Sequence, residues 1–372
     1  GEGVWVWDVE GRKYLDMLSS YSALNQGHRH PKIVKAMKDQ ADRLCLTSRA
    51  FHHDSFGPFC EMLCKATGFE RFLPMNTGAE GVETAIKAAR RWGYQDKGVA
   101  ADKAEIVVCE GNFHGRTTTI VGLSSDELYY GGFGPFGPGF RKIPYNDIKA
   151  LEAAITDNTV GFLVEPIQGE AGINVPDDGY LKQARQVCDE HKVLLMLDEI
   201  QTGLGRTGKL FCYEYEGIRP DVLILGKALG GGCFPVSGIL SSKQVMDAAF
   251  KPGNHGSTFG GNPMACAVAQ AAVQVILDEG LVENSYKMGE YMRAKLAQMD
   301  SPHVAGIRGK GLLVGVEIKQ ESGPARPFCE KLMGLGLLCK ETHVTVIRFA
   351  PPLTITKNDL DWALERIAKV LK

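Results

Sequence analysis

Between residues 71 and 242, short apolar segments alternate with segments of helical periodicity, and few folds accommodate that order. Strands that are apolar on both faces and are separated by helices form a mostly parallel sheet that helices cover. The sequence therefore predicts an α/β fold. The expected strands are 71–76, 104–110, 159–167, 193–200, 221–228 and 236–242, and the expected helices are 79–94, 146–156 and 179–192.

The two ends of the chain differ from this central region. Residues 3–17 alternate aromatic and β-branched side chains around a turn, which is typical of a β-hairpin. A helix is expected to begin at Pro31, and a long helical stretch, 262–298, is expected to break near Gly280. The segments after that break form an α+β pattern, with strands at 311–318 and 343–350 and a closing helix at 360–372.

These patterns predict three parts along the chain. The hairpin belongs to an N-terminal segment, and because the chain starts without methionine and almost directly in a strand, we expect a further piece upstream of it. A large domain contains the parallel sheet, and a smaller α+β domain follows. The predicted bounds are 1–22 for the N-terminal segment, 23–281 for the large domain and 282–372 for the small domain.

Composition excludes several classes of protein. Lys and Arg number 42 against 44 Asp and Glu, and this balance argues against nucleic-acid binding, which requires a clustered basic excess. No apolar run approaches the roughly 20 residues that span a bilayer, so no membrane segment is expected. The ten cysteines form no metal-ligand spacing, so we expect no metal and reduced thiols in an intracellular enzyme, in the cytoplasm or the mitochondrial matrix.

Polar and glycine residues close the apolar runs of four of the expected strands. They are Asn76 to Gly78, Glu165, Asp198, and Gly226 with Lys227. Ligands of open parallel sheets bind beyond the carboxyl ends of the strands. Any one of these groups is compatible with an ordinary turn, but their occurrence at four strand ends predicts a ligand site at that edge of the sheet.

Lys227 and Asp198 form the pair that pyridoxal phosphate chemistry requires. A lysine at the end of a buried strand loses solvation, which lowers its pKa and makes the amine reactive toward carbonyl groups. A carboxylate that faces a pyridine nitrogen keeps it protonated, so that the ring draws electrons. The alternatives are a lysine that extends its amine to solvent and an aspartate that caps a helix or forms an ion pair.

A phosphate site is expected where the strand at 71–76 runs into a helix. The backbone N–H groups at the start of that helix form an anion site, and Gly78 permits close approach. The alternative is that Thr77 caps the helix without contacting a ligand.

Two motifs resemble the signature of the class III pyridoxal-phosphate-dependent aminotransferases, and the resemblance extends over essentially the whole chain. They are LDEIQTGLGRTGK at 197–209 and PDVLILGKALGGG at 220–232. Within that class the chain is most similar to the ornithine aminotransferases, with the 4-aminobutyrate and acetylornithine aminotransferases as near neighbours. The segments that carry this likeness are SSYSALNQGHRHP, LTSRAF, MNTGAE, GNFHGRT, VEPIQGEAG, HGSTFGGNP and VIRFAPPL.

The resemblance implies the fold of the type I pyridoxal-phosphate enzymes and that cofactor. Lys227 would bind the cofactor covalently and move the substrate proton, and Asp198 would pair with the ring nitrogen. The other implied contacts are Gln201 at the phenolic oxygen, Phe113 on the ring face with His114 beside it, Thr77, Gly78 and Ala79 at the phosphate, Glu165 behind the cofactor, and Ser257 and Thr258 at the phosphate of a partner subunit. The last two imply a homodimer.

The resemblance also implies the substrates and the residues that bind them. The δ-amino group of L-ornithine would pass to 2-oxoglutarate, giving L-glutamate 5-semialdehyde and L-glutamate. Arg348 would bind the α-carboxylate of 2-oxoglutarate or glutamate, and Glu170 would neutralise that arginine while ornithine is bound. Arg116 would bind the carboxylate of ornithine, with Tyr21 beside it. The alternatives are a surface ion pair for Arg116 and core packing for Tyr21.

Three other functions are compatible with parts of the sequence. The segment Gly203 to Gly208 matches GxGxxG, but Lys227 ends the next strand, where a dinucleotide fold needs an acidic residue. A non-enzymatic protein that keeps the cofactor fold is disfavoured, since Lys227, Asp198 and Arg348 are all present. An acetylornithine or 4-aminobutyrate aminotransferase is the main alternative.

Overall fold

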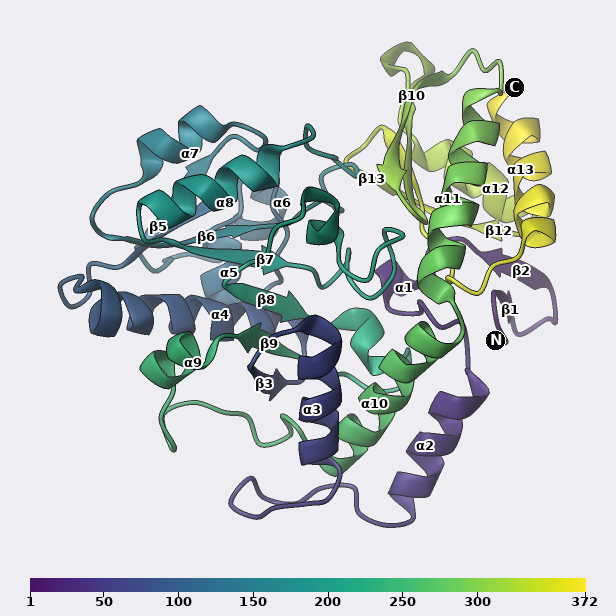
Figure 1. The fold of residues 1–372 in the computed structure, drawn as a ribbon. Coiled ribbons are helices and arrows are strands. Elements are labelled where there is room, and N and C mark those ends of the chain that lie inside the picture. The colour runs from purple at the N-terminus through teal and green to yellow at the C-terminus, as the bar shows by residue number, and fades with distance from the viewer.

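A seven-stranded sheet forms the centre of the computed structural model, which describes residues 1–372 (Figure 1). The strand order is β3-β9-β8-β7-β6-β4-β5, and the mostly parallel arrangement is confirmed. β9 is the exception, because it pairs antiparallel with both β3 and β8. The strands are β3 (Arg71–Met75), β4 (Glu105–Cys109), β5 (Phe140–Ile143), β6 (Thr159–Val164), β7 (Leu194–Asp198), β8 (Val222–Leu225) and β9 (Ser237–Ser241).

Apolar side chains on both faces explain why helices cover the sheet on both sides. Val107 and Leu195 pack into one core cluster, and their neighbours Ile106 and Met196 pack into another, because successive side chains of a strand point to opposite faces. Helices α4 and α9 cover one face and α7 and α8 the other (Figure 1). Their bounds are α4 (Gly78–Trp92), α7 (Ile148–Ala154), α8 (Tyr180–Glu190) and α9 (Lys243–Ala249).

The C-terminal part contains a four-stranded antiparallel sheet of order β10-β11-β14-β13 with helices packed against it (Figure 1). The N-terminal hairpin joins this part, because its second strand pairs parallel with β12. The elements are β1 (Trp5–Trp7), β2 (Lys13–Asp16), β10 (Val304–Lys310), β11 (Leu313–Ile318), β12 (Leu337–Leu338), β13 (Lys340–Thr342), β14 (Val346–Phe349), α11 (Leu281–Ala297), α12 (Arg326–Gly334) and α13 (Lys357–Leu371).

The remaining helices connect these parts. The expected break near Gly280 separates α10 from α11, and Gly280 itself has a left-handed backbone with φ 64°. The predicted division between the large and the small domain, at 281/282, lies next to this break, at the start of α11, and remains a prediction. The helices are α1 (Ser19–Ser22), α2 (Pro31–Ala41), α3 (Phe56–Thr67), α5 (Thr118–Gly122), α6 (Glu127–Tyr130) and α10 (Pro263–Asp278).

The structure also bears on the cysteines and on membrane-spanning segments. All ten cysteines are free thiols. Taken singly, the helices are all too short or too polar to cross a membrane; α10 and α11 reach the necessary length only as a pair, which is bent by 59°.

Candidate active site

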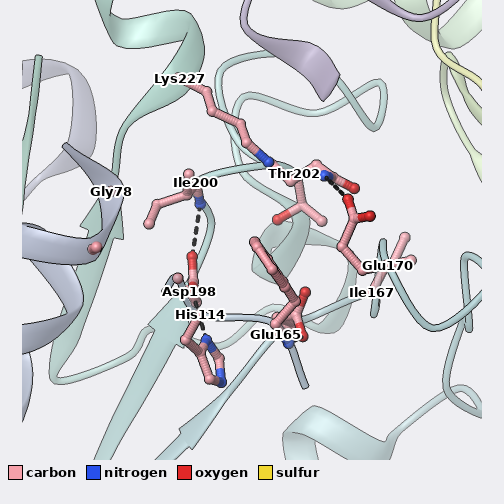
Figure 2. A pocket seen from close by; sticks show the side chains of 13 residues that line it. Gly78, His114, Glu165, Ile167, Glu170, Asp198, Ile200, Thr202 and Lys227 are labelled. Carbon is pink, nitrogen blue, oxygen red and sulfur yellow. Dashed lines mark hydrogen bonds and ion pairs between the residues drawn. The ribbon is translucent and has the colours of Figure 1, made fainter. Parts of the chain in front are cut away.

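The carboxyl ends of β3, β6, β7 and β8 meet at one edge of the sheet, as the strand directions require. Residues that follow these strands, and the loop that follows β4, surround a cavity of about 200 Å³ (Figure 2). The predicted site residues that line it are Gly78, Ala79, Phe113, His114, Glu165, Glu170, Asp198, Gln201 and Lys227.

Lys227 follows β8 and extends its side chain into this cavity (Figure 2). Its backbone is left-handed, with φ 42°, a conformation that a residue with a Cβ adopts at a cost of about 1–2 kcal/mol. Such strain is found most often at functional sites. Burial lowers the pKa of the Lys227 amine, although the nearby Glu170 carboxylate opposes that shift. The amine is therefore easier to deprotonate than an exposed lysine.

Asp198, at the end of β7, is held by two hydrogen bonds. Its Oδ1 accepts from the backbone N–H of Ile200 at 3.1 Å, and its Oδ2 lies 2.7 Å from Nδ1 of His114. Burial alone would lower the pKa of His114, but the hydrogen bond and charge of Asp198 outweigh burial and raise it. The Asp198 carboxylate is therefore held in place from two sides.

Glu165 follows β6 and lies near this pair. Its Oε2 accepts from the backbone N–H of Phe113 at 3.0 Å, and burial raises the pKa of its carboxyl to about 7. The hydrogen bond holds the Phe113 loop against the end of β6. Glu165 therefore supports the wall of the cavity on which Phe113 lies.

Glu170 and Arg348 form an ion pair, with Oε1 of Glu170 2.6 Å from Nη1 of the almost fully buried Arg348. Burial would raise the pKa of Glu170, but the charge of Arg348 outweighs it and lowers that pKa. Gln201 donates from Nε2 to the same Oε1 at 3.2 Å. The hydroxyl of Thr342 donates to the backbone carbonyl of Glu170 at 2.6 Å. The carboxylate and the backbone of Glu170 are therefore both held from β13 and β14.

The turn between β3 and α4 contains a capping box. The Thr77 hydroxyl accepts from the backbone N–H of Glu80, and the Glu80 carboxylate accepts from the backbone N–H of Thr77 at 2.7 Å. The alternative weighed for Thr77, helix capping, therefore describes its contacts, and Thr77 does not line the cavity. Gly78 and Ala79 do line it, and N–H groups in the first turn of a helix have no partner within the helix.

Ser257 and Thr258 lie on the loop between α9 and α10 and do not line the cavity of their own chain. The Ser257 hydroxyl accepts a hydrogen bond from Nδ2 of Asn76 at 2.8 Å. Asn76 also donates to Glu80 of the capping box at 3.0 Å. The loop is therefore joined to the turn at which α4 begins.

A second cavity, of about 510 Å³, opens beside the first and contains Arg116, Tyr21 and Lys227. Tyr21 lines this cavity together with Arg116, and its ring lies against Arg348, with the guanidinium carbon 4.8 Å from the ring centroid. The cause is a left-handed turn at Ser19–Ser22, which brings this ring against β14. Tyr129, which the sequence analysis does not identify, lies beside Arg116, whose guanidinium carbon is 4.7 Å from the centroid of the Tyr129 ring.

The residues around the first cavity fit pyridoxal phosphate. The lysine amine, the Asp198 carboxylate and the free N–H groups of Gly78 and Ala79 match an aldehyde, a ring nitrogen and a phosphate. Two buried polar atoms at the site, Oε1 of Gln201 and Nε2 of His114, have no hydrogen-bond partner in the protein. Unpaired buried polar atoms are rare, and a ligand in this cavity would explain them.

The fold and this site define a pyridoxal-phosphate-dependent aminotransferase. Residues 1–371 match the family Aminotransferase class-III, and the chain belongs to that family. An ornithine aminotransferase of Brevibacillus brevis is 61% identical over 370 residues, which cover 100% of this chain and 92% of the relative. The ornithine aminotransferase of Bacillus subtilis is 60% identical over 370 residues, or 100% of this chain and 91% of the relative.

Solved structures agree with this assignment. The ornithine aminotransferase of Toxoplasma gondii ME49 has a TM-score of 0.98 and 45% identity, covering 100% of this chain and 89% of the other. A second structure of the Toxoplasma gondii enzyme is described with partial occupancy of the cofactor at its active site. An acetylornithine aminotransferase of Elizabethkingia anophelis has a TM-score of 0.89 and 47% identity, covering 100% of this chain and 92% of the other.

Proposed function

We propose that the protein transfers the δ-amino group of L-ornithine to 2-oxoglutarate, with L-glutamate 5-semialdehyde and L-glutamate as products. The observation that carries this proposal is the Glu170–Arg348 ion pair beside Lys227. An arginine covered by a movable carboxylate suits an enzyme whose two substrates present different groups at the same place. The ornithine aminotransferases among its relatives support the choice of amino donor.

Pyridoxal phosphate would be held by residues that surround the first cavity. Bound there, it supplies an electron sink for the carbon that carries the amino group and a carrier for that group. Lys227 would bind it covalently, and Asp198 would hold the proton on its ring nitrogen. The remaining assignments are Gly78 and Ala79 at the phosphate, Phe113 on the ring face, Gln201 at the phenolic oxygen, Thr77 as the cap that fixes the phosphate-binding turn, and Glu165 and His114 as supports.

Lys227 is assigned the proton transfer. Its lowered pKa leaves more of the amine neutral near pH 7, as a general base requires. In the first half-reaction Nζ of Lys227 takes a proton from the δ-carbon of ornithine. In the second it returns a proton to the α-carbon that becomes that of glutamate.

Glu170 is assigned the choice between the two substrates. With glutamate or 2-oxoglutarate, Glu170 turns away and the α-carboxylate takes its place on Arg348. With ornithine, an apolar chain faces Arg348, and a buried charge without its partner would cost about 3–5 kcal/mol. Glu170 therefore stays in place, and Arg116 binds the carboxylate of ornithine.

A homodimer is part of the proposal. Ser257 and Thr258 would reach the phosphate in the partner subunit, and two features support this. Their loop is joined through Asn76 to the turn that would hold the phosphate of their own subunit. The neighbouring Phe259 is 51% exposed in the single chain, which leaves a large apolar side chain available for a contact with a second copy.

The test is a single-turnover visible spectrum of the cofactor-loaded protein with one amine at a time. We expect ornithine to bleach the band of the lysine-bound cofactor faster than N-acetylornithine or 4-aminobutyrate, and 2-oxoglutarate to restore the band. A faster reaction with either other amine would keep the class and overturn the substrate. Absence of the band after cofactor is added would overturn the roles of Lys227 and Asp198.

A further inference from the structure

Tyr129 lies on α6, a short helix that is fixed to the same loop as Phe113. The Asp126 side chain caps α6 by accepting from the backbone N–H of Leu128 at 2.9 Å. Nδ2 of Asn112 donates to the carbonyl of Leu123 at 3.1 Å, and the Ser125 hydroxyl accepts from the N–H of Gly111 at 2.8 Å. These bonds fix the segment before α6 against the end of β4, and the position of Tyr129 is therefore defined.

The guanidinium of Arg116 packs against two aromatic rings that also contact each other. Its central carbon is 4.7 Å from the ring centroid of Tyr129 and 5.3 Å from that of Phe113. The two rings meet edge to face at 5.4 Å, an arrangement that aromatic pairs favour. Arg348 is paired with Glu170, whereas Arg116 has no carboxylate partner within the chain. Its charge is therefore free to receive a carboxylate from a ligand.

Arg348, which is buried behind Glu170, and Arg116, which lines the second cavity, each lie over a tyrosine ring. Arg348 lies 4.8 Å from the ring of Tyr21, and Arg116 lies 4.7 Å from the ring of Tyr129. Burial, together with the charge of Glu170, raises the pKa of the Tyr129 phenol, so the ring stays neutral at physiological pH. The Arg116–Tyr129 contact thus resembles the Arg348–Tyr21 contact in distance.

We propose that Tyr129 is a positioning residue that holds Arg116 ready for the carboxylate of the amino donor. This inference rests on the proposed function, in which Arg116 binds that carboxylate. A free arginine side chain has many rotamers, and binding a carboxylate would restrict them. The ring face fixes the guanidinium plane in advance and leaves the outer N–H groups for the ligand.

The test compares amino donors with and without a carboxylate in the cofactor-loaded enzyme. Tyr129→Leu and Tyr129→Met remove the ring, and Tyr129→Phe keeps it. The matched control is Tyr130→Leu, since Tyr130 is on the same helix but packs on Phe136 and does not line the cavity. The donors are L-ornithine, 5-aminopentanoate and butylamine. 5-Aminopentanoate keeps the carboxylate of ornithine but lacks its α-amino group, and butylamine lacks both groups.

Loss of a cation–π contact at a partly buried site corresponds to about a tenfold weaker interaction. We expect Tyr129→Leu and Tyr129→Met to raise KM for ornithine and 5-aminopentanoate by about tenfold while kcat changes less than about threefold. For butylamine, KM and kcat of these two variants should stay within about twofold of the parent values. For Tyr129→Phe and Tyr130→Leu, the same should hold with all three donors. In an Arg116→Gln background, Tyr129→Leu should have no further effect on KM.

A second measurement does not depend on turnover. Calorimetry should show that pentanoate binds about tenfold more weakly to the Tyr129→Leu holoenzyme than to the parent. Pentanoate should bind with the same affinity to Arg116→Gln and to the double variant Arg116→Gln/Tyr129→Leu. The proposal is overturned if Tyr129→Leu raises KM for butylamine as much as for ornithine. It is also overturned if the effects of Tyr129→Leu and Arg116→Gln on KM are additive. Should the parent enzyme prefer N-acetylornithine or 4-aminobutyrate, the substrate assignment fails, and the same comparison with that donor decides the role of Tyr129.

Discussion

At the scale of single residues, Glu170 controls whether Arg348 is neutralised. We predict that Glu170→Ala lowers the rate of the ornithine half-reaction by about tenfold or more, because ornithine then faces an unpaired buried charge. The glutamate half-reaction should change less than about threefold, since glutamate brings its own carboxylate to Arg348. Single-turnover spectra with each donor measure both rates, and the control is Glu127→Ala, which removes an exposed carboxylate of α6 that lines neither cavity. Equal losses in both half-reactions would contradict the switch.

His114 makes a contact that the sequence did not indicate. The resemblance implies that it stands beside Phe113 at the cofactor, and in the structure its Nδ1 lies 2.7 Å from Oδ2 of Asp198. Removing a partner from a charged buried hydrogen bond costs about 1.5–3 kcal/mol, so His114→Ala should weaken cofactor binding by about tenfold or more. Absorbance titration of the apoenzyme with pyridoxal phosphate measures this affinity. His114→Asn keeps a hydrogen-bond donor and should recover part of the lost affinity. If His114→Ala binds pyridoxal phosphate as tightly as the parent does, the His114–Asp198 hydrogen bond does not contribute to cofactor binding.

At the scale of elements, the turn between β3 and α4 links helix stability to the phosphate site. Thr77→Ala removes one half of the capping box and should lower the free energy of unfolding by about 1 kcal/mol, whereas Thr77→Ser should be nearly neutral. Urea unfolding measures the difference. If Thr77 instead bound the phosphate directly, Thr77→Ala would weaken cofactor affinity without this loss of stability.

The elements that the sequence predicted are those with strong local patterns. The strands that end in Met75, Val164, Asp198 and Leu225 are mostly apolar, and the polar residues at or just after their ends indicated the site. β10, which has no buried residue, and α3, which begins Phe-Gly-Pro, lack such patterns and were not predicted.

Contacts between distant elements had no signal in the sequence. The pairing of β12 with β2 joins residues more than 300 positions apart. The position of Tyr129 over Arg116 likewise depends on how the α6 segment is tethered to β4, which no periodicity encodes. Sequence reasoning therefore found the residues that end strands and missed those that act through a tertiary contact.

At the scale of the whole molecule, Arg206 joins the parallel sheet to the C-terminal part. Its side chain is fully buried and donates to the carbonyls of Leu312 and Pro351 at 3.0 and 2.5 Å, and to Oδ1 of Asn25 at 2.6 Å. Pro351 comes three residues after Arg348, so the same contacts fix the strand that carries the substrate arginine. A buried guanidinium with no carboxylate partner is retained here by three hydrogen-bond acceptors from separate segments.

Arg206→Met should therefore destabilise the molecule as a unit. The substitution fills most of the volume but leaves three buried acceptors without a donor, and each costs about 1–3 kcal/mol. We expect the free energy of unfolding to fall by at least about 3 kcal/mol in urea at fixed protein concentration. The control Arg141→Met breaks a partly exposed ion pair with Glu105 and should cost less than about 1 kcal/mol. Equal losses for the two variants would mean that solvent or a rearranged loop satisfies those acceptors, and that Arg206 does not hold the two parts together.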